Sequence, residues 1–170
     1  MEAHSKSTAK LSYATSQIMD DEDYMKLALK QAVKAAELGE VPVGAVVTNA
    51  DGIVTVAHNR RELDHDPSAH AEFIALRKAA QILKRWRLSD CSVYVTLEPC
   101  PMCAGLMQQA RIKRCIYAIS DSKAGALGTL YRLHDDERLN HSFQLATGVL
   151  EDEARDQLQN FFTELRKKCS

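Results

Sequence analysis

The sequence predicts an α/β protein, folded as one three-layer α/β/α domain around a mixed central sheet of about five strands. Segments with the apolar spacing of helices alternate with short strand-like runs along the chain. An antiparallel hairpin opens the series, with its turn at Asp51-Gly52. The 170 residues, 45% hydrophobic and 26% charged, suit a single domain with one core. We find no internal repeat and no domain boundary.

The predicted strands are short runs rich in apolar and β-branched residues, and they span 43–48, 53–57, 91–97, 114–119 and 143–147. The predicted helices carry an apolar stripe, and they span 20–38, 66–84, 101–110 and 152–168. Asp20 or Asp21 can cap the first helix, and Gly39 ends it. Asp66 and Pro67 supply a cap and a first-turn proline for the second helix.

Residues 1–19 are polar and unpatterned, and we predict that they form a disordered leader ahead of one folded domain at 20–170. Segments 60–66 and 125–128 are predicted loops, the second with a short helical turn. No apolar run approaches the roughly 20 residues of a membrane span, so no membrane association is expected. The five cysteines are an odd number and two have metal-ligand spacing, which favours a reducing compartment, the cytoplasm, over a disulfide framework.

The residues with the clearest chemical meaning lie in two motifs. His70 and Glu72 form an H-x-E motif, and Cys100 and Cys103 belong to a P-C-x-x-C motif at 99–103. One imidazole and two thiolates are the protein ligands expected for a tetrahedral zinc that keeps a water at its fourth position. The two cysteines share one helix face near a helix N-terminus, where thiolates are favoured. Glu72 is a carboxylate that could move a proton on that water.

These residues also admit other interpretations. A Cys-x-x-Cys pair between a strand and a helix is also typical of thioredoxin-type redox proteins, but the upstream H-x-E motif favours zinc. A closed structural zinc site would need Cys91 or Cys115, and both lie in strand-like runs away from the helix ends. Side chains two residues apart on an ideal helix project about 200° apart, so His70 and Glu72 can share a metal site only across a helix end.

H-x-E followed by P-C-x-x-C is the signature of zinc-dependent nucleobase deaminases. More narrowly, the sequence resembles the bacterial-type tRNA-specific adenosine deaminases of the cytidine/deoxycytidylate deaminase superfamily. The resemblance covers roughly residues 22–168, including a Phe161-Phe162 helix near the end. Its motifs are E-V-P-V-G-A at 40–45, H-D-P-S-A-H-A-E at 65–72, T-L-E-P-C at 96–100 and D-S-K-A-G-A at 121–126.

The resemblance implies a cytidine-deaminase-like fold with one zinc per chain, held by His70, Cys100 and Cys103. It implies hydrolytic deamination of adenosine to inosine at the wobble position of tRNA anticodon loops, where zinc acidifies the attacking water and Glu72 transfers protons. The expected partners are therefore a tRNA anticodon stem-loop and, from the family, a second copy of the chain in a homodimer.

Two further positions match the substrate contacts of that family. Asn59 follows the second strand and Asp121 follows the fourth, although both residue types also occur as caps in ordinary turns. His58 stands where relatives often carry a larger aromatic residue. Residues 77–132 carry ten Lys and Arg against three Asp and Glu, a basic centre compatible with a nucleic-acid substrate or with an ordinary solvated face. Candidate phosphate contacts are Arg111, Lys113, Arg114, Lys123, Arg166, Lys167 and Lys168.

Two alternative functions remain open from the sequence. The first is a deaminase of a free base or nucleoside such as guanine, cytosine or cytidine, and Pro101 does not discriminate because guanine-deaminase relatives carry it too. The second is an inactive zinc-bearing partner subunit, which would lack the glutamate that Glu72 supplies here. In the expected homodimer, Leu106 and Met107 could line the interface, although core packing is the other role of such residues.

Overall fold

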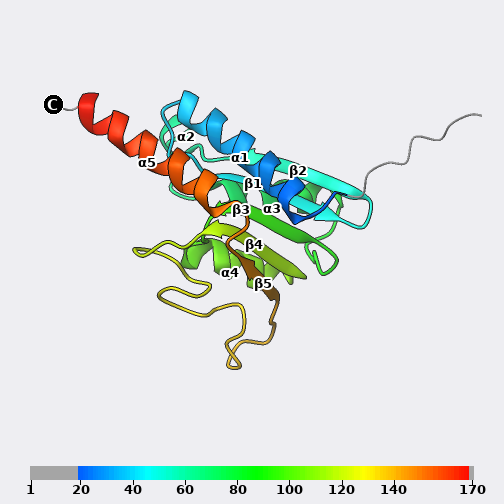
Figure 1. Ribbon diagram of the computed structural model, residues 1–170. Helices are drawn as coiled ribbons and strands as arrows, with labels where there is room; N and C mark the ends of the chain where they lie inside the picture. The colour runs from blue at the N-terminus through cyan, green and yellow to red at the C-terminus, as the bar shows by residue number, and fades with distance from the viewer. Residues whose placement is uncertain (1–18, 169–170) are drawn as a thin grey trace, which may run out of the picture.

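The computed structural model describes residues 19–168 of the chain, so residues 1–18 of the predicted leader and Cys169 lie outside the described residues. The helices are α1 (Asp21–Glu37), α2 (Arg61–Asp64), α3 (Ala71–Ile82), α4 (Pro101–Ala110) and α5 (Glu151–Lys168) (Figure 1). The strands are β1 (Gly44–Asn49), β2 (Gly52–His58), β3 (Ser92–Leu97), β4 (Arg114–Ile119) and β5 (Gln144–Thr147).

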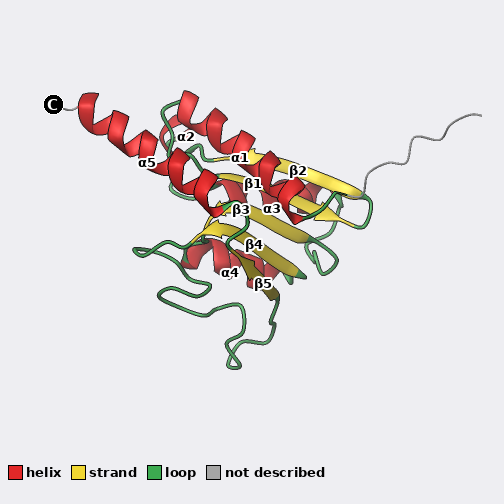
Figure 2. Cartoon of the chain, viewed as in Figure 1, coloured by secondary structure: helices red, strands yellow, loops and turns green. Residues whose placement is uncertain are grey.

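The predicted mixed sheet is confirmed, with five strands in the order β2-β1-β3-β4-β5. Strand β1 runs antiparallel to β2 and β3, while β3, β4 and β5 are parallel to one another. Helices α1 and α5 cover one face of the sheet and α3 and α4 cover the other, which gives the three predicted layers (Figure 2). Among residues 19–168, no helix combines the length and the apolarity that a bilayer crossing requires.

The central strands are buried on both faces because their side chains alternate between the two helix layers. On β3, Val93 and Val95 pack in the cluster on the α3/α4 side, whereas Tyr94 packs in the cluster on the α1/α5 side. Cys115 and Ile116 divide in the same way on β4. These apolar runs therefore fix the register of the sheet, since a slip of one residue would exchange the two faces.

Helix α1 begins and ends as its sequence predicts. The Asp20 carboxylate accepts a hydrogen bond from the Asp23 N–H at 2.9 Å, and the Asp23 carboxylate accepts one from the Asp20 N–H at 3.3 Å, forming a capping box. Gly39 follows the helix with φ at +79°, a conformation that glycine adopts without strain. A Cβ on Gly44 would lie 1.9 Å from the Ala28 carbonyl oxygen, so α1 rests directly on β1.

The predicted start of the second long helix at Asp66-Pro67 is wrong, because α3 begins at Ala71. The Asp66 carboxylate instead accepts hydrogen bonds from the Ser68 N–H at 2.8 Å and the Ser68 hydroxyl at 2.7 Å, so it caps a local turn. His70 thereby becomes the N-cap of α3. Two smaller differences are the short helix α2 inside the predicted loop 60–66 and the non-helical turns that replace the helical turn expected at 125–128.

Candidate metal centre and catalytic pocket

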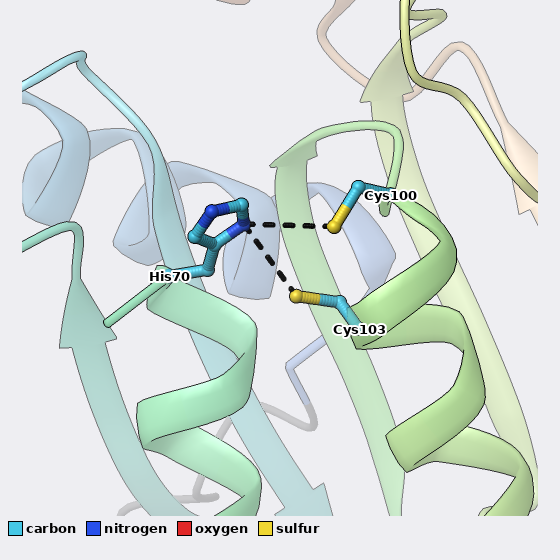
Figure 3. Close-up of side chains that lie close together, drawn as sticks. All are labelled: His70, Cys100 and Cys103. Atoms are coloured by element: carbon cyan, nitrogen blue, oxygen red, sulfur yellow. Dashed lines mark hydrogen bonds between the residues drawn. The ribbon is translucent and has the colours of Figure 1, made fainter. Parts of the chain in front are cut away.

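Two helix N-termini meet at the candidate metal centre. His70 is the N-cap of α3 with φ −76° and ψ 148°, and Cys100 is the N-cap of α4 with φ −73° and ψ 171°. Their carbonyl oxygens accept the first hydrogen bonds of the two helices, from the N–H groups of Ile74 and Ala104 at 2.9 Å. Neither side chain caps its own helix, so both are free to face one another across the gap (Figure 3). Because His70 has an extended backbone and precedes the helix, it is not bound by the ideal helical geometry that would point its side chain away from that of Glu72.

The three candidate ligands have the separations that zinc requires. His70 Nδ1 lies 3.7 Å from Cys100 Sγ and 3.6 Å from Cys103 Sγ (Figure 3). A tetrahedral zinc with bonds of about 2.0–2.1 Å to nitrogen and about 2.3 Å to sulfur sets the N···S separation at about 3.6 Å. Within the described chain no other His, Cys, Asp or Glu joins this group, and Cys91 and Cys115 lie buried in the core. The group therefore fits a three-ligand site rather than a closed structural one.

Hydrogen bonds among the three ligands divide their protons unequally. The hydrogen bond from Cys103, assisted by His70, lowers the pKa of Cys100 to about 4. The same bond, together with burial, raises the pKa of Cys103 above its usual range. The hydrogen bond to Cys100 also raises the pKa of the His70 ring. Cys100 is therefore held as a thiolate, and an incoming cation would displace the proton of Cys103.

Glu72 lies in the same pocket as two of these ligands and carries a buried oxygen without a hydrogen-bond partner. Its side chain is 3% exposed, and Oε2 has no hydrogen-bond partner among the described residues. Burial raises the pKa of its carboxyl group. Glu72, His70 and Cys100 share the wall of a pocket of about 190 Å³. The rest of the lining includes Val41, Val43, Asn59, Leu97, Asp121 and Ala124.

Asn59 lies in this pocket wall, but both ends of its amide also bind the backbone. Its Oδ1 accepts a hydrogen bond from the Ala71 N–H at 2.9 Å, and its Nδ2 donates to the Val41 carbonyl oxygen at 3.2 Å. The Ala71 N–H is one of the first in α3 and has no partner within the helix. Asn59 therefore anchors the helix start that presents His70 and Glu72. Its predicted contact with substrate stays a prediction.

Asp121 caps a loop and also lines the pocket. Its Oδ1 accepts hydrogen bonds from the N–H groups of Lys123 at 2.9 Å and Ala124 at 3.2 Å. Both bonds use the same oxygen, so Oδ2 can still accept a hydrogen bond from a ligand in the pocket. The sequence-predicted residues Asn59, Glu72 and Asp121 are thus brought together in one cavity with the ligands.

The predicted phosphate contacts are partly engaged within the protein. Arg114 binds Asp21 with both terminal nitrogens, at 2.9 and 2.7 Å, and this hydrogen bonding lowers the pKa of Asp21. Lys167 pairs with Glu164 at 2.7 Å on α5. Arg61, which is not among the predicted phosphate contacts, lines the pocket. Its signal was available, because it follows Asn59 in an N-R-R run at 59–61.

Comparison with known proteins agrees with this geometry. The profile of the MafB19-like deaminase family matches residues 19–166. A tRNA-specific adenosine deaminase of Bacillus subtilis is 47% identical over 148 residues, which cover 87% of this chain and 92% of that protein. The chain belongs to the tRNA-specific adenosine deaminase family. The resemblance and the fold predicted from the sequence are both confirmed.

Two solved structures share the fold of this chain. A structure described as a tRNA:A34 deaminase, with A-to-I editing at the wobble position of transfer RNA, has a TM-score of 0.77 and 37% identity. That match covers 79% of this chain and 98% of the other. A guanine deaminase from Bacillus subtilis has a TM-score of 0.57 and 38% identity, over 60% of this chain and 66% of the other. The family fold therefore accommodates both a nucleic-acid substrate and a free base.

Proposed function

We propose that this protein is a zinc-dependent hydrolytic deaminase that converts adenosine to inosine at the wobble position of tRNA anticodon loops. The observation that carries the proposal is the buried Glu72 carboxylate, whose unpartnered Oε2 shares one pocket with the ligand group His70, Cys100 and Cys103. The substrate follows from the family, since the Bacillus subtilis relative bears the name tRNA-specific adenosine deaminase.

His70, Cys100 and Cys103 would hold one zinc ion per chain. When bound, zinc supplies a water whose pKa is lowered toward 7 as the nucleophile of the reaction. The N···S separations of 3.6 and 3.7 Å support this ion, and three protein ligands are the number that catalytic zinc sites use. Thiolate ligands must stay reduced, which supports a reducing compartment, the cytoplasm, as the place of action.

Glu72 would carry the protons of the reaction. As a carboxylate it accepts one proton from the attacking water and passes it to the purine ring nitrogen. It then accepts the second proton, from the hydroxyl group now on the ring carbon, and passes it to the departing amino group. Burial favours the protonated form that donation requires. Asn59 and Asp121 would contact the nucleoside from the pocket wall, where both side chains lie. Ammonia and inosine are the products.

A base can enter this pocket only when it leaves its stack. The cavity of about 190 Å³ is bounded on several sides by β-strand ends and helix starts, which excludes a paired duplex. An anticodon loop offers an unpaired adenosine, and Arg61 at the pocket wall supplies a cation for the adjoining backbone. These features support a loop adenosine, while the guanine deaminase match keeps a free base as the second candidate.

We also infer a homodimer formed through the outer surfaces of α3 and α4. A groove of about 330 Å³ lies there, lined in part by Leu106 and by Trp86, whose side chain is 60% exposed. Exposed aromatic side chains at an apolar groove are typical anchors of protein interfaces. Met107, the second residue suggested for the interface, is fully buried and belongs to the core.

The test is inosine and ammonia formation on a synthetic anticodon stem-loop with adenosine at the wobble position. Free adenosine, guanine, cytosine and cytidine are assayed beside it, together with a stem-loop that carries guanosine at that position. Turnover on the adenosine stem-loop alone supports the proposal. Turnover on a free base instead would show that the protein is a free-base deaminase, the second candidate function. Activity on none of them, with zinc bound, would contradict both.

A further inference from the structure

A second buried carboxylate lies at the carboxyl end of β3, and the proposed reaction gives it no task. Glu98 is 2% exposed and receives four hydrogen bonds from one segment, residues 121–129. The Asp121 N–H donates to Oε2 at 3.0 Å, and the Leu127 and Thr129 N–H groups donate to Oε1 at 3.1 Å. The Thr129 hydroxyl also donates to Oε2.

The same segment packs directly against the turn that carries Glu98. A Cβ on Gly125 would lie 2.3 Å from Glu98 Oε2, so only glycine allows this approach. The Ala126 N–H donates to the Pro99 carbonyl oxygen at 2.9 Å. Pro99 directly precedes the metal-ligand candidate Cys100 in the sequence. Segment 121–129 is therefore seated on the strand end that positions this ligand.

This arrangement links the two sides of the pocket. Asp121 and Ala124 line the pocket from the segment, and Cys100 lines it from the start of α4. Glu98 lines the same pocket and accepts hydrogen bonds from donors of the segment, which would otherwise lack a partner. Losing acceptors for buried N–H groups carries the full desolvation penalty of each, so the segment would move to satisfy them elsewhere.

We propose that Glu98 is a positioning residue that holds segment 121–129 as the substrate-binding wall at a fixed distance from the metal centre. The proposal rests on the proposed function, because the wall is assigned to the nucleic-acid substrate of that reaction. Glu98 also lines the pocket, but both of its carboxylate oxygens are engaged by donors of segment 121–129. Its loss therefore weakens substrate binding rather than the chemical step.

Glu98→Gln tests the proposal with little change in side-chain size. The amide keeps one acceptor oxygen and replaces the other with an NH₂ donor, and in either orientation the NH₂ faces a backbone N–H from which it cannot accept. For the stem-loop substrate we expect KM to rise about 10- to 100-fold, the size of effect that lost charged hydrogen bonds produce. We expect kcat and zinc content per chain to change less than threefold. A purely structural role would lower the active fraction, reducing kcat and leaving KM unchanged.

Gly125→Ala is an independent variant that disturbs the same contact from the other side. It should raise KM in the same way, and the double variant should raise it less than the product of the two single effects. Gly105→Ala is the matched control, because a Cβ there meets nothing within 4 Å on α4. Its KM should equal that of the parent protein. Equal effects of Gly105→Ala and Gly125→Ala would overturn the proposal.

Hydrogen–deuterium exchange supplies a readout that needs no activity. In Glu98→Gln the amides of 121–129 should exchange at least tenfold faster than in the parent protein, while those of β4 stay unchanged. If the parent protein were inactive on every stem-loop, the proposed function would fail, and faster exchange in this segment would still support the anchoring role of Glu98. Unchanged exchange in the segment would overturn that role whatever the activity.

Discussion

Replacing Asn59 with alanine removes two hydrogen bonds that hold the start of α3. The Ala71 N–H loses its acceptor at 2.9 Å, and the Val41 carbonyl oxygen loses its donor at 3.2 Å. Ala71 is fully buried, so its N–H cannot turn to water, whereas Val41 is partly exposed. An unsatisfied buried group costs about 1–3 kcal/mol, and the Val41 oxygen falls at the low end because solvent can reach it. The free energy of unfolding should therefore fall by about 2–4 kcal/mol.

Urea unfolding followed by circular dichroism measures this change. Asn49→Ala is the matched control, because the Asn49 side chain accepts one hydrogen bond, from the Asp51 N–H at 2.9 Å, in the exposed hairpin turn. Its loss should cost less than about 1 kcal/mol. Transfer of zinc to a competing chelator should also be faster in Asn59→Ala, since His70 directly precedes Ala71. An Asn59→Ala variant within about 0.5 kcal/mol of the parent protein would refute the anchoring role.

Four further changes separate chemistry from stability. Glu72→Gln should reduce turnover about 10²- to 10⁴-fold with unchanged zinc content by atomic emission, and a variant that keeps more than a tenth of the turnover would contradict its proton-transfer role. Cys103→Ser should weaken zinc retention against a chelator while leaving the helix content unchanged; equal retention would remove it from the ligand set. Gly44→Ala should lower the free energy of unfolding by about 3 kcal/mol or more, because its Cβ would strike the α1 backbone at 1.9 Å, and a neutral result in urea would contradict this close packing. The Asp21 pKa is lowered by Arg114, so this pair stabilises the fold fully above about pH 4 and the effect is lost as pH falls through the folded pKa; Asp21→Asn should therefore differ from the parent near neutral pH and approach it in acid.

Local patterns predicted the fold well where the physical cause is itself local. The sequence predicts a strand at 114–119 and a helix at 101–110, and β4 and α4 have these bounds. Each is a continuous apolar or amphipathic run bounded by turn residues. The start of α3 was misplaced for an equally local reason. Asp66 can cap either a helix or a turn, and the serine two residues later captures its carboxylate for a turn.

The residues of the site could be predicted from the sequence, but the hydrogen bonds that hold them in place could not. The ligand group and Glu72 stand in short motifs whose spacing carries chemical meaning. Three of the four hydrogen bonds of Glu98 come instead from backbone groups 23 to 31 residues away, and the one that Asn59 accepts comes from 12 residues away. Almost every residue carries a backbone N–H, so the sequence does not show which of these groups donate to a buried carboxylate or amide. Only the structure does. In the sequence, Glu98 is marked only by its place in the T-L-E-P-C motif at the end of a buried strand.

The ligand group lies at the edge of the hydrophobic core, with Cys103 fully buried and His70 and Cys100 partly exposed. Neither of the two buried clusters, one on each face of the sheet, includes His70, Cys100 or Cys103. Folding therefore draws its free energy from apolar burial, unlike small zinc domains that are unfolded without their ion. We expect the polypeptide to fold first and the zinc ion to bind afterwards at a ligand site that is already formed. In a zinc-starved cell the consequence would be a reserve of intact, inert protein that regains function on resupply without new synthesis.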